Sequence, residues 1–427
     1  MNKLYERCDI LVFNPYFVYS YSILLVLAVY QLNWSDIYPT LNIELLLFLL
    51  ITGIVSLIIG IFVKRKQFIK FEEVDFNKKY YYVTVAIFVG YIIEFIFHRN
   101  IPLISIFTNS GLGYKDFGIP MFHVILVTFH SFFTIYLFHV YLSVRKRNIL
   151  IVYLIMLIPP LLIVNRGMLV IILMSSVFVL LYQIKKLNYK YIVSLGAVGI
   201  VFLYCFGLFG NLRVNDSYDR DVSVFDSTII MDVGGASEDF KDSIIPNSVF
   251  WAYTYIASPL ANFQHTVNHA EFDESIYNNI PDYMTSQLIP DAIGKRINGS
   301  YFDEPVELNL ISRELIVATI FAEGYVLLNW AGPIITFFYL IGISLLYILI
   351  LKKYNSPFLI TGMALMSSLF LLNSFDNMIK FSGLSLQLIF PLLFILYEVV
   401  KEKRRKWKEK NCKRVMASMF NNLDQLQ

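Results

Sequence analysis

The stretch LNIELLLFLLITGIVSLIIGIFV, residues 41–63, carries a single charged side chain, Glu44. A helix crosses the ~30 Å hydrocarbon layer of a bilayer in roughly 20 residues, because each residue advances about 1.5 Å. This stretch is therefore long and apolar enough to form a transmembrane helix.

Further apolar runs of the same character lie on both sides of it. The predicted spans cover 15–32, 41–63, 80–98, 120–142, 148–164, 167–184, 190–209, 329–351, 357–375 and 380–400. The run at 148–164 contains Pro159 and Pro160, and proline removes a helical hydrogen bond, so we expect a kink or a broken helix there. The sequence thus predicts an all-α polytopic membrane protein with about ten transmembrane helices.

Composition supports this fold class. Of the 427 residues 57% are hydrophobic and 16% are charged, whereas soluble domains are nearer a quarter charged. The small net charge of +3 argues against nucleic acid as a partner. The three cysteines, Cys8, Cys205 and Cys412, and the six histidines show no metal-ligand spacing. We therefore expect neither a metal nor another cofactor.

The orientation follows from the basic residues, because Lys and Arg are retained on the cytoplasmic side of a membrane. Most of the 35 Lys and Arg residues lie in alternate connections, including 64–79, 145–147 and the tail after Lys401. Both termini are therefore predicted to be cytoplasmic, in a multi-pass protein of the bacterial inner membrane. The N-terminus has no signal-peptide cleavage site, so its first apolar run is read as a retained helix.

With this orientation the chain divides into four parts. Residues 1–209 hold the first seven spans, 210–328 form a large extracytoplasmic loop, 329–400 hold the last three spans, and 401–427 form a basic cytoplasmic tail. The tail either fixes the topology or also binds anionic membrane lipids, at about 1 kcal/mol per basic residue near the surface.

The outer loop has helical periodicity of its own. IPNSVFWAYTYIASPLANFQHTVNHA, residues 245–270, repeats apolar residues at helical spacing after Pro246, which suits a first helical turn. A second helical stretch is expected in NLISRELIVATIFAEGYVLLNW, residues 309–330, leading into the eighth span. Loops of this length with their own helices are usually functional.

Two arginines lie at the outer ends of predicted spans. Arg166, in NRGML at 165–169, either extends to the headgroups or binds an anion, and Arg213 follows the seventh span at the same expected depth. Together they would form a clamp for a phosphate or pyrophosphate, which the planar guanidinium recognises well.

Several histidines are candidates for proton transfer or for local hydrogen bonding. His265 and His269 lie one helical turn apart on the outer side, and an imidazole accepts a proton near neutral pH. Within the spans, His130 and Glu94 are expected to form a polar pair inside the bundle.

Read together, these segments resemble the O-antigen and capsule repeat-unit polymerases (the Wzy family). The matching features are the NRGML turn, the arginine of GNLR at 210–213, the WAYTYIASPLANF segment at 251–263 and the FAEGYVLLNWAGP segment at 321–333. Arg313, followed by ten residues and then Gly324, fits the spacing described for polymerase loops.

The resemblance implies a metal-independent glycosyltransferase with a GT-C-like fold. It would transfer a growing glycan from undecaprenyl pyrophosphate to the non-reducing end of another lipid-linked repeat unit, in O-antigen, capsule or exopolysaccharide biosynthesis. Arg166, Arg213 and Arg313 would bind the pyrophosphate, and His265 or Glu323 would be the base. Tyr253 and Tyr255 would offer aromatic faces to sugar rings, or else pack between helices.

Two other functions remain open at this point. An O-antigen ligase shares the architecture, and a lipid-linked oligosaccharide flippase is the rival that is not an enzyme. The partners expected from the resemblance are undecaprenyl-pyrophosphate-linked glycans, membrane lipids and a chain-length regulator of the same pathway.

Overall fold

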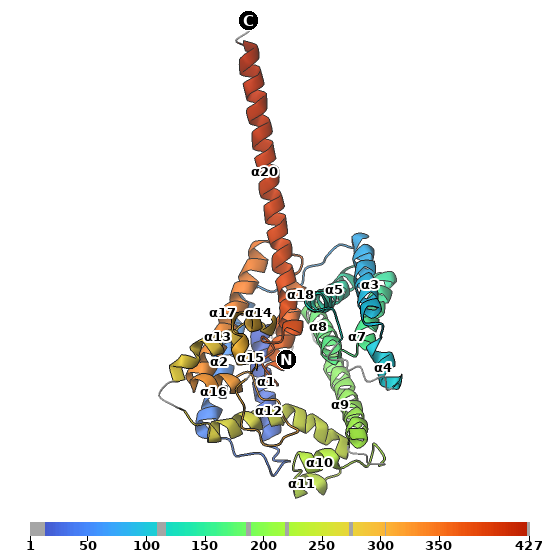
Figure 1. Ribbon diagram of the computed structural model, residues 1–427, viewed down its shortest axis with the longest axis vertical. Coiled ribbons are helices and arrows are strands. Elements are labelled where there is room, and N and C mark those ends of the chain that lie inside the picture. Colours follow the sequence, from blue (N-terminus) through green and yellow to red (C-terminus); the bar gives the residue numbers. More distant parts are fainter. Residues whose placement is uncertain are drawn as a thin grey trace, which may run out of the picture.

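The computed structural model describes residues 13–108, 117–184, 189–217, 222–272, 276–303 and 305–424, and these residues form helices and loops without a strand. A single bridge between Ser35 and Ala236 is the only β-type pairing among them. The predicted all-α class is therefore confirmed for the described part of the chain (Figure 1).

The N-terminal half contains α1 (Pro15–Tyr30), α2 (Ile43–Arg65), α3 (Lys79–His98), α4 (Pro102–Thr108), α5 (Phe122–Val144), α6 (Arg147–Ile155), α7 (Ile158–Leu162), α8 (Arg166–Gln183) and α9 (Tyr189–Ser217). The predicted outer loop contains α10 (Ile229–Val233), α11 (Glu238–Lys241), η3 (Asn247–Val249), α12 (Phe250–His269), η4 (Ile276–Asn279), α13 (Ile280–Gln287), α14 (Asp291–Ile297), α15 (Gly299–Asp303) and α16 (Ala322–Leu328). The C-terminal part contains α17 (Ala331–Lys353), α18 (Leu359–Leu372), α19 (Ser382–Ser385), η5 (Leu386–Leu388) and α20 (Ile389–Asp424).

Every predicted span contains a helix, but not every helix is long enough to cross a membrane. Length and apolar composition qualify six of the described helical segments: Ile43–Arg65, Lys79–His98, Phe122–Val144, Arg166–Gln183, Ala331–Lys353 and Ser382–Trp407. The shorter apolar segments are Pro15–Tyr30, Arg147–Leu162, Leu203–Leu212 and Leu359–Leu372. The total of about ten spans and the GT-C-like fold stay predictions.

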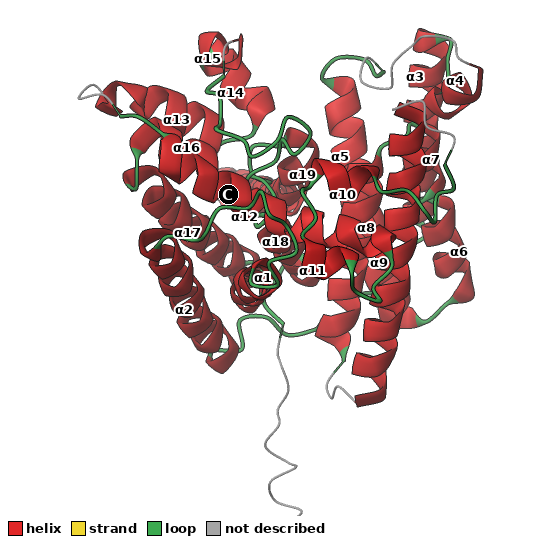
Figure 2. Cartoon of the chain, turned by 90° about the horizontal axis from the view of Figure 1, so that it is seen from below, coloured by secondary structure: helices red, strands yellow, loops and turns green. Residues whose placement is uncertain are grey.

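Two hydrophobic clusters form the interior, and α18 contributes to both. One cluster joins α18 to α1, α2, α12 and α17, and the other joins it to α3, α5 and α8. Seen from the opposite end to α20, α12 crosses between these two groups of helices (Figure 2). The loop helix α12 is thus part of the interior, so whatever it positions is held by both halves of the bundle.

The break predicted at Pro159 and Pro160 is confirmed, because α6 ends at Ile155 and α7 begins at Ile158. Pro160 has no N–H to give to the carbonyl of Met156 four residues earlier. His130 Nε2 lies 2.8 Å from that carbonyl oxygen and must donate to it, so Nδ1 accepts from the Tyr91 hydroxyl at 2.8 Å. A buried side chain thus replaces the missing backbone donor, as an apolar environment requires.

The expected pair of His130 and Glu94 is wrong. Glu94 is fully buried and instead lies 2.9 Å from Nδ1 of His123, one end of α5 away. It also accepts a hydrogen bond from the backbone N–H of Ile119. His123 and His130 are seven residues apart on the same face of α5, and the offset between α3 and α5 brings the first of them to Glu94.

The first predicted loop helix is confirmed as α12, whereas the second is only partly correct. Residues 305–319 are extended or bent, and the helix α16 begins at Ala322. The buried amide of Asn262 on α12 binds this segment: Nδ2 donates to the carbonyls of Leu315 and Val317, and Oδ1 accepts from Ile311 N–H. These bonds satisfy backbone groups that a helix would otherwise pair within itself.

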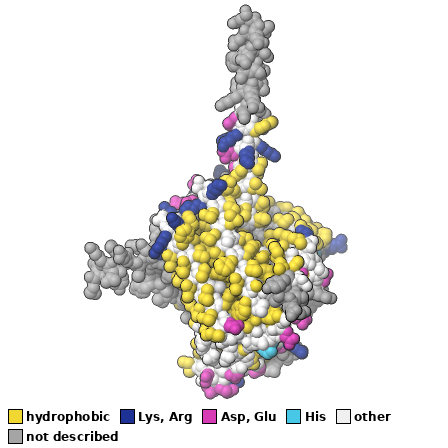
Figure 3. Space-filling view, turned by 90° about the vertical axis from the view of Figure 1, so that its left-hand side faces the viewer, with side chains coloured by type: hydrophobic (Ala, Val, Ile, Leu, Met, Phe, Trp, Pro, Cys, Tyr) yellow, Lys and Arg dark blue, Asp and Glu magenta, His cyan; other side chains and the backbone are white. Residues whose placement is uncertain are grey.

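Basic connections gather at one end of the molecule. Lys352 Nζ donates to the carbonyl of Gln67 and lies over the Phe68 ring, and Lys146 lies over the Phe76 ring. On the face shown in Figure 3, an apolar band separates Lys and Arg side chains near α20 from Asp and Glu side chains at the opposite end. This distribution fits a membrane protein whose basic end is cytoplasmic, and the assignment of sides stays a prediction.

We predict the sidedness of two fusions. A reporter fused at Lys353 should report the cytoplasm, and one fused at Asp239 should report the outer side, because Lys353 ends α17 at the basic end and Asp239 lies on α11 at the other. The measurement is the paired activity of a phosphatase, active only outside, and a fluorescent protein, active only inside. The reverse pattern would invert the topology and remove the site described below from the outer face.

Candidate functional site

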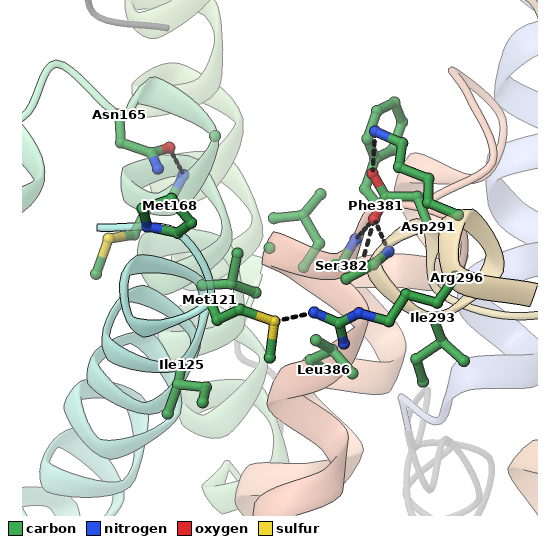
Figure 4. A pocket seen from close by; sticks show the side chains of 17 residues that line it. Met121, Ile125, Asn165, Met168, Asp291, Ile293, Arg296, Phe381, Ser382 and Leu386 are labelled. Carbon is green, nitrogen blue, oxygen red and sulfur yellow. Dashed lines mark hydrogen bonds and ion pairs between the residues drawn. The ribbon is translucent and has the colours of Figure 1, made fainter. Parts of the chain in front are cut away.

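A pocket of about 860 Å³ opens between the two halves of the bundle at the start of α8. One wall comes from the first turns of α5 and α8, and the other from α14, α19 and η5 (Figure 4). Apolar side chains such as Met121, Ile125, Ile293 and Leu386 cover most of it. A pocket of this size and lining suits the polar head and first carbons of an amphiphile.

The start of α8 gives one wall a positive end. Asn165 caps the helix through its side-chain oxygen, which accepts from Met168 N–H at 2.9 Å, and Arg166 is the exposed first residue. Asn165 and Gly167, on either side of Arg166, both line the pocket. Free N–H groups at a helix start favour anions, so the NRGML turn lies where it was expected to act.

The opposite wall contributes Lys295 and Arg296 from α14. The guanidinium of Arg296 points across the pocket to the sulfur of Met121 (Figure 4), a weak acceptor that leaves its other donors available. Lys295 Nζ lies 3.9 Å from a carboxylate oxygen of Asp291. With Arg166, cations outnumber the single lining carboxylate, so the pocket favours an anionic group.

Asp291 fixes α14 to the segment that precedes α20. Its backbone N–H donates to the carbonyl of Lys380 at 2.7 Å, and its carboxylate accepts from both the N–H and the hydroxyl of Ser382. Ser382 Oγ also accepts from Ala292 N–H at 2.8 Å. This network sets the position of Arg296 independently of its flexible side chain.

A second polar cluster begins on the same segment, where Lys380 bridges two carboxylates. Its Nζ lies 2.5 Å from Oε1 of Glu323 and 3.6 Å from Oδ1 of Asp376. The other oxygen of Glu323 accepts from Gln287 Nε2 at 2.7 Å, and Gln287 in turn accepts from Asn377 Nδ2. Glu323 is thus held on both oxygens, two residues of chain away from the pocket wall at Ser382.

Burial and the bridging lysine act on these charges in opposite directions. Burial raises the pKa of Asp376, although Lys380 opposes the rise. Burial alone would lower the pKa of Lys380, but Glu323 and Asp376 raise it further, so the net shift is upward. Lys380 therefore remains charged and keeps the two carboxylates together.

The structure brings Arg166 and Glu323 to neighbouring sites but places the other predicted residues elsewhere. Arg213 lies near the end of α9, whose Asn211 accepts from Trp251 Nε1 at 2.6 Å, beside the start of α12; its side chain is outside the described set. Arg313 is exposed in the bend at 311–314. The proposed clamp of Arg166 with Arg213 stays a prediction.

His265 lies at the far end of α12. Its Nδ1 is 3.2 Å from the carbonyl oxygen of Asn309, and its ring stacks on His269 with centroids 4.2 Å apart. Asn309 belongs to the segment that carries Arg313, so His265 and Arg313 share one region that is separate from the large pocket. A role of His265 as a base stays a prediction, and Glu323 is the candidate nearer the pocket.

The two tyrosines proposed for sugar binding have different surroundings. Tyr253 is buried, stacks on Tyr38 with centroids 5.5 Å apart and also contacts Trp34, so it acts here as a packing residue between α12 and the first outer connection. Tyr255 is partly buried and stacks on Phe375, next to Asp376, at 5.7 Å. Sugar binding by either ring stays a prediction.

Sequence reasoning missed Lys295, Arg296, Asp376 and Lys380 as site residues. The adjacent basic pair KR at 295–296 follows a proline and a short helix on the predicted outer side, where basic residues are scarce. That pair was the one available signal. Nothing in sequence spacing links Lys380 to Glu323, which lies 57 residues earlier.

Within the described residues no group of three His, Cys, Asp or Glu side chains is arranged to hold a metal ion. Comparison of the chain with protein-family models, with curated proteins and with solved structures finds no match.

Proposed function

We propose that this chain is a glycosyltransferase of the bacterial inner membrane that polymerises lipid-linked repeat units. It would transfer a glycan from undecaprenyl pyrophosphate to the non-reducing end of another lipid-linked unit. The observation that supports this best is the apolar pocket with Arg166 and Arg296 on facing walls, next to the held carboxylate of Glu323.

The chemistry of the transfer asks for both parts of this arrangement. The acceptor hydroxyl gives its proton to Glu323 while its oxygen bonds to the anomeric carbon, and the bond from that carbon to the pyrophosphate oxygen breaks. Negative charge grows on the leaving pyrophosphate, and fixed guanidinium groups and a helix start stabilise such charge. Lys380 and Gln287 hold the Glu323 carboxylate for the proton transfer. Arg213 and Arg313 remain proposed as further contacts of the pyrophosphate.

A cellular experiment separates the polymerase from its nearest rivals. Loss of a polymerase leaves single repeat units on the final acceptor, loss of a ligase leaves none, and loss of a flippase keeps repeat units on the cytoplasmic side. Deletion of the gene followed by electrophoresis of the surface glycan reads these outcomes. A deletion strain without any units on the acceptor would exclude the polymerase.

The arginines of the pocket provide a direct prediction. Arg166→Gln and Arg296→Gln should each reduce polymerisation about a hundredfold, because one lost charged contact in a transition state costs on the order of 3 kcal/mol. The measurement is polymer formed per minute by membranes supplied with lipid-linked repeat units, beside a blot of the same membranes. Arg166→Lys should also be impaired, because a point charge replaces the planar fork.

The matched control is Arg99→Gln, since Arg99 is exposed at the end of α3 and does not line the pocket. It should polymerise at the rate of the parent. Full activity of Arg166→Gln and Arg296→Gln at normal abundance would show that the pocket does not bind the leaving group, and full activity of Arg166→Lys alone would reduce Arg166 to a headgroup anchor.

A further inference from the structure

A second, much smaller cavity lies beneath residues 305–319, which we call the strap. It has a volume of about 30 Å³, and Glu323, Asp376, Gln287, Asn377 and Thr319 supply its polar lining. A space of this size accepts one water-sized group. The cavity is therefore shaped for a single hydroxyl rather than for a whole sugar ring.

One lining group has no partner in the protein. The hydroxyl of Thr319 is buried, with 7% of the residue exposed, and makes no hydrogen bond within the described part of the chain. Its neighbours do, since Gln287 and Asn377 bind each other and Glu323 binds Gln287 and Lys380. Buried hydroxyls are normally satisfied, so an orphan beside two carboxylates indicates a ligand group that completes the cavity.

The strap controls access to this cavity. Leu308, Ile316, Ala318 and Ile320 on the strap and its end form the rest of the lining. The strap is not a regular element, and it is fastened to α12 by side chains: Asn262 binds Ile311, Leu315 and Val317. Thr266 Oγ1 donates to the carbonyl of Asn309 at 3.1 Å. A segment held by a few such bonds opens at lower cost than a packed helix.

We propose that this cavity binds the reacting hydroxyl of the acceptor sugar and that the strap opens to admit it. The inference rests on the proposed function and assigns its second substrate: a sugar alcohol O–H that donates to Glu323 and accepts from the Thr319 hydroxyl. The anionic donor occupies the large pocket, and the segment from Asp376 to Ser382 lies between the two sites. Proton transfer to Glu323 occurs inside a closed, water-free space.

The first test removes the orphan hydroxyl. Thr319→Val keeps the shape of the side chain, and a hydroxyl without a partner contributes nothing to folding, so the abundance and thermal midpoint should stay at or above those of the parent. Polymer formed per minute from lipid-linked repeat units should fall roughly tenfold, as expected for one lost hydrogen bond to a ligand. Thr319→Ser should retain most activity.

Ser248→Ala is the matched control, because the Ser248 hydroxyl is equally buried and also lacks a partner among the described groups, but lies in η3, outside the cavity. It should change neither stability nor activity. Parental activity of Thr319→Val would overturn the hydroxyl site, and so would an equal loss in Ser248→Ala.

The second test measures the strap without any glycan. In a background with Cys8, Cys205 and Cys412 changed to serine, Thr319→Cys should react slowly with a membrane-impermeant maleimide added from outside. Adding Asn262→Leu removes the three bonds that fasten the strap and should raise the labelling rate about tenfold or more. Asp239→Cys, on exposed α11, should label fast in both backgrounds and serves as the reagent control.

An unchanged Thr319→Cys rate after Asn262→Leu, or immediate labelling in the parent background, would overturn the strap. Accelerated labelling in a chain that polymerises no lipid-linked units would keep the strap and reject the proposed function instead, so the two failures are distinguishable.

Discussion

Gly332→Ala should leave little folded protein in the membrane. An added Cβ at this position would lie 1.9 Å from the carbonyl oxygen and 2.5 Å from the carbonyl carbon of Gly324. Both atoms are backbone, so no side-chain rotation relieves the contact, and the connection between α16 and α17 would have to open. We expect a destabilisation of about 3 kcal/mol or more, the upper range for overpacking.

The control for this variant lies in the same helix. Gly342→Ala adds its methyl group where no other atom lies within 4 Å, and alanine is the better helix former by about 1 kcal/mol. Its abundance and thermal midpoint in detergent should equal or exceed those of the parent. Equal stability of the two variants would show that Gly324 and Gly332 do not touch in the folded protein.

Glu323→Gln should remove nearly all polymerisation while leaving the protein in place. A general base contributes about 10²–10⁴-fold to a rate, and the amide that replaces it cannot take a proton. The amide oxygen still accepts from Lys380 or Gln287, and Lys380 keeps Asp376 as a partner. We therefore expect near-normal abundance on a membrane blot together with single repeat units in the glycan ladder.

Glu238→Gln is the control, since Glu238 is an exposed residue of α11 paired only with Lys241 among the described side chains. It should give the parental ladder. A normal ladder from Glu323→Gln would move the role of base elsewhere, and His265→Gln would then be the next variant to lose activity.

The features that the sequence predicted correctly depend on local chemistry. Apolar length predicts the helices around the stretch 41–63, and the proline pair at 159–160 predicts the break between α6 and α7, because proline acts on its own helix. The helix α12 follows from apolar spacing over residues 245–270.

The features that it missed depend on distant contacts. His123 rather than His130 reaches Glu94 because of the offset between two helices, which periodicity does not encode. The strap reads as helical until the Asn262 amide, about fifty residues earlier, takes its backbone groups. The cluster around Lys380 likewise joins residues that only the packed bundle brings together.

The last helix extends far beyond the bundle. α20 runs without a break to Asp424, and its apolar window ends at Trp407 (Figure 1). At about 1.5 Å per residue the remainder reaches roughly 25 Å further, which is two to three times the ~8–10 Å over which salt screens a charge. Lys401 and Arg404 are therefore close enough to sense anionic headgroups, whereas the end of the rod is electrically remote from the bilayer. A protein domain attached there would respond to the ions of its own compartment rather than to the lipid composition beneath it.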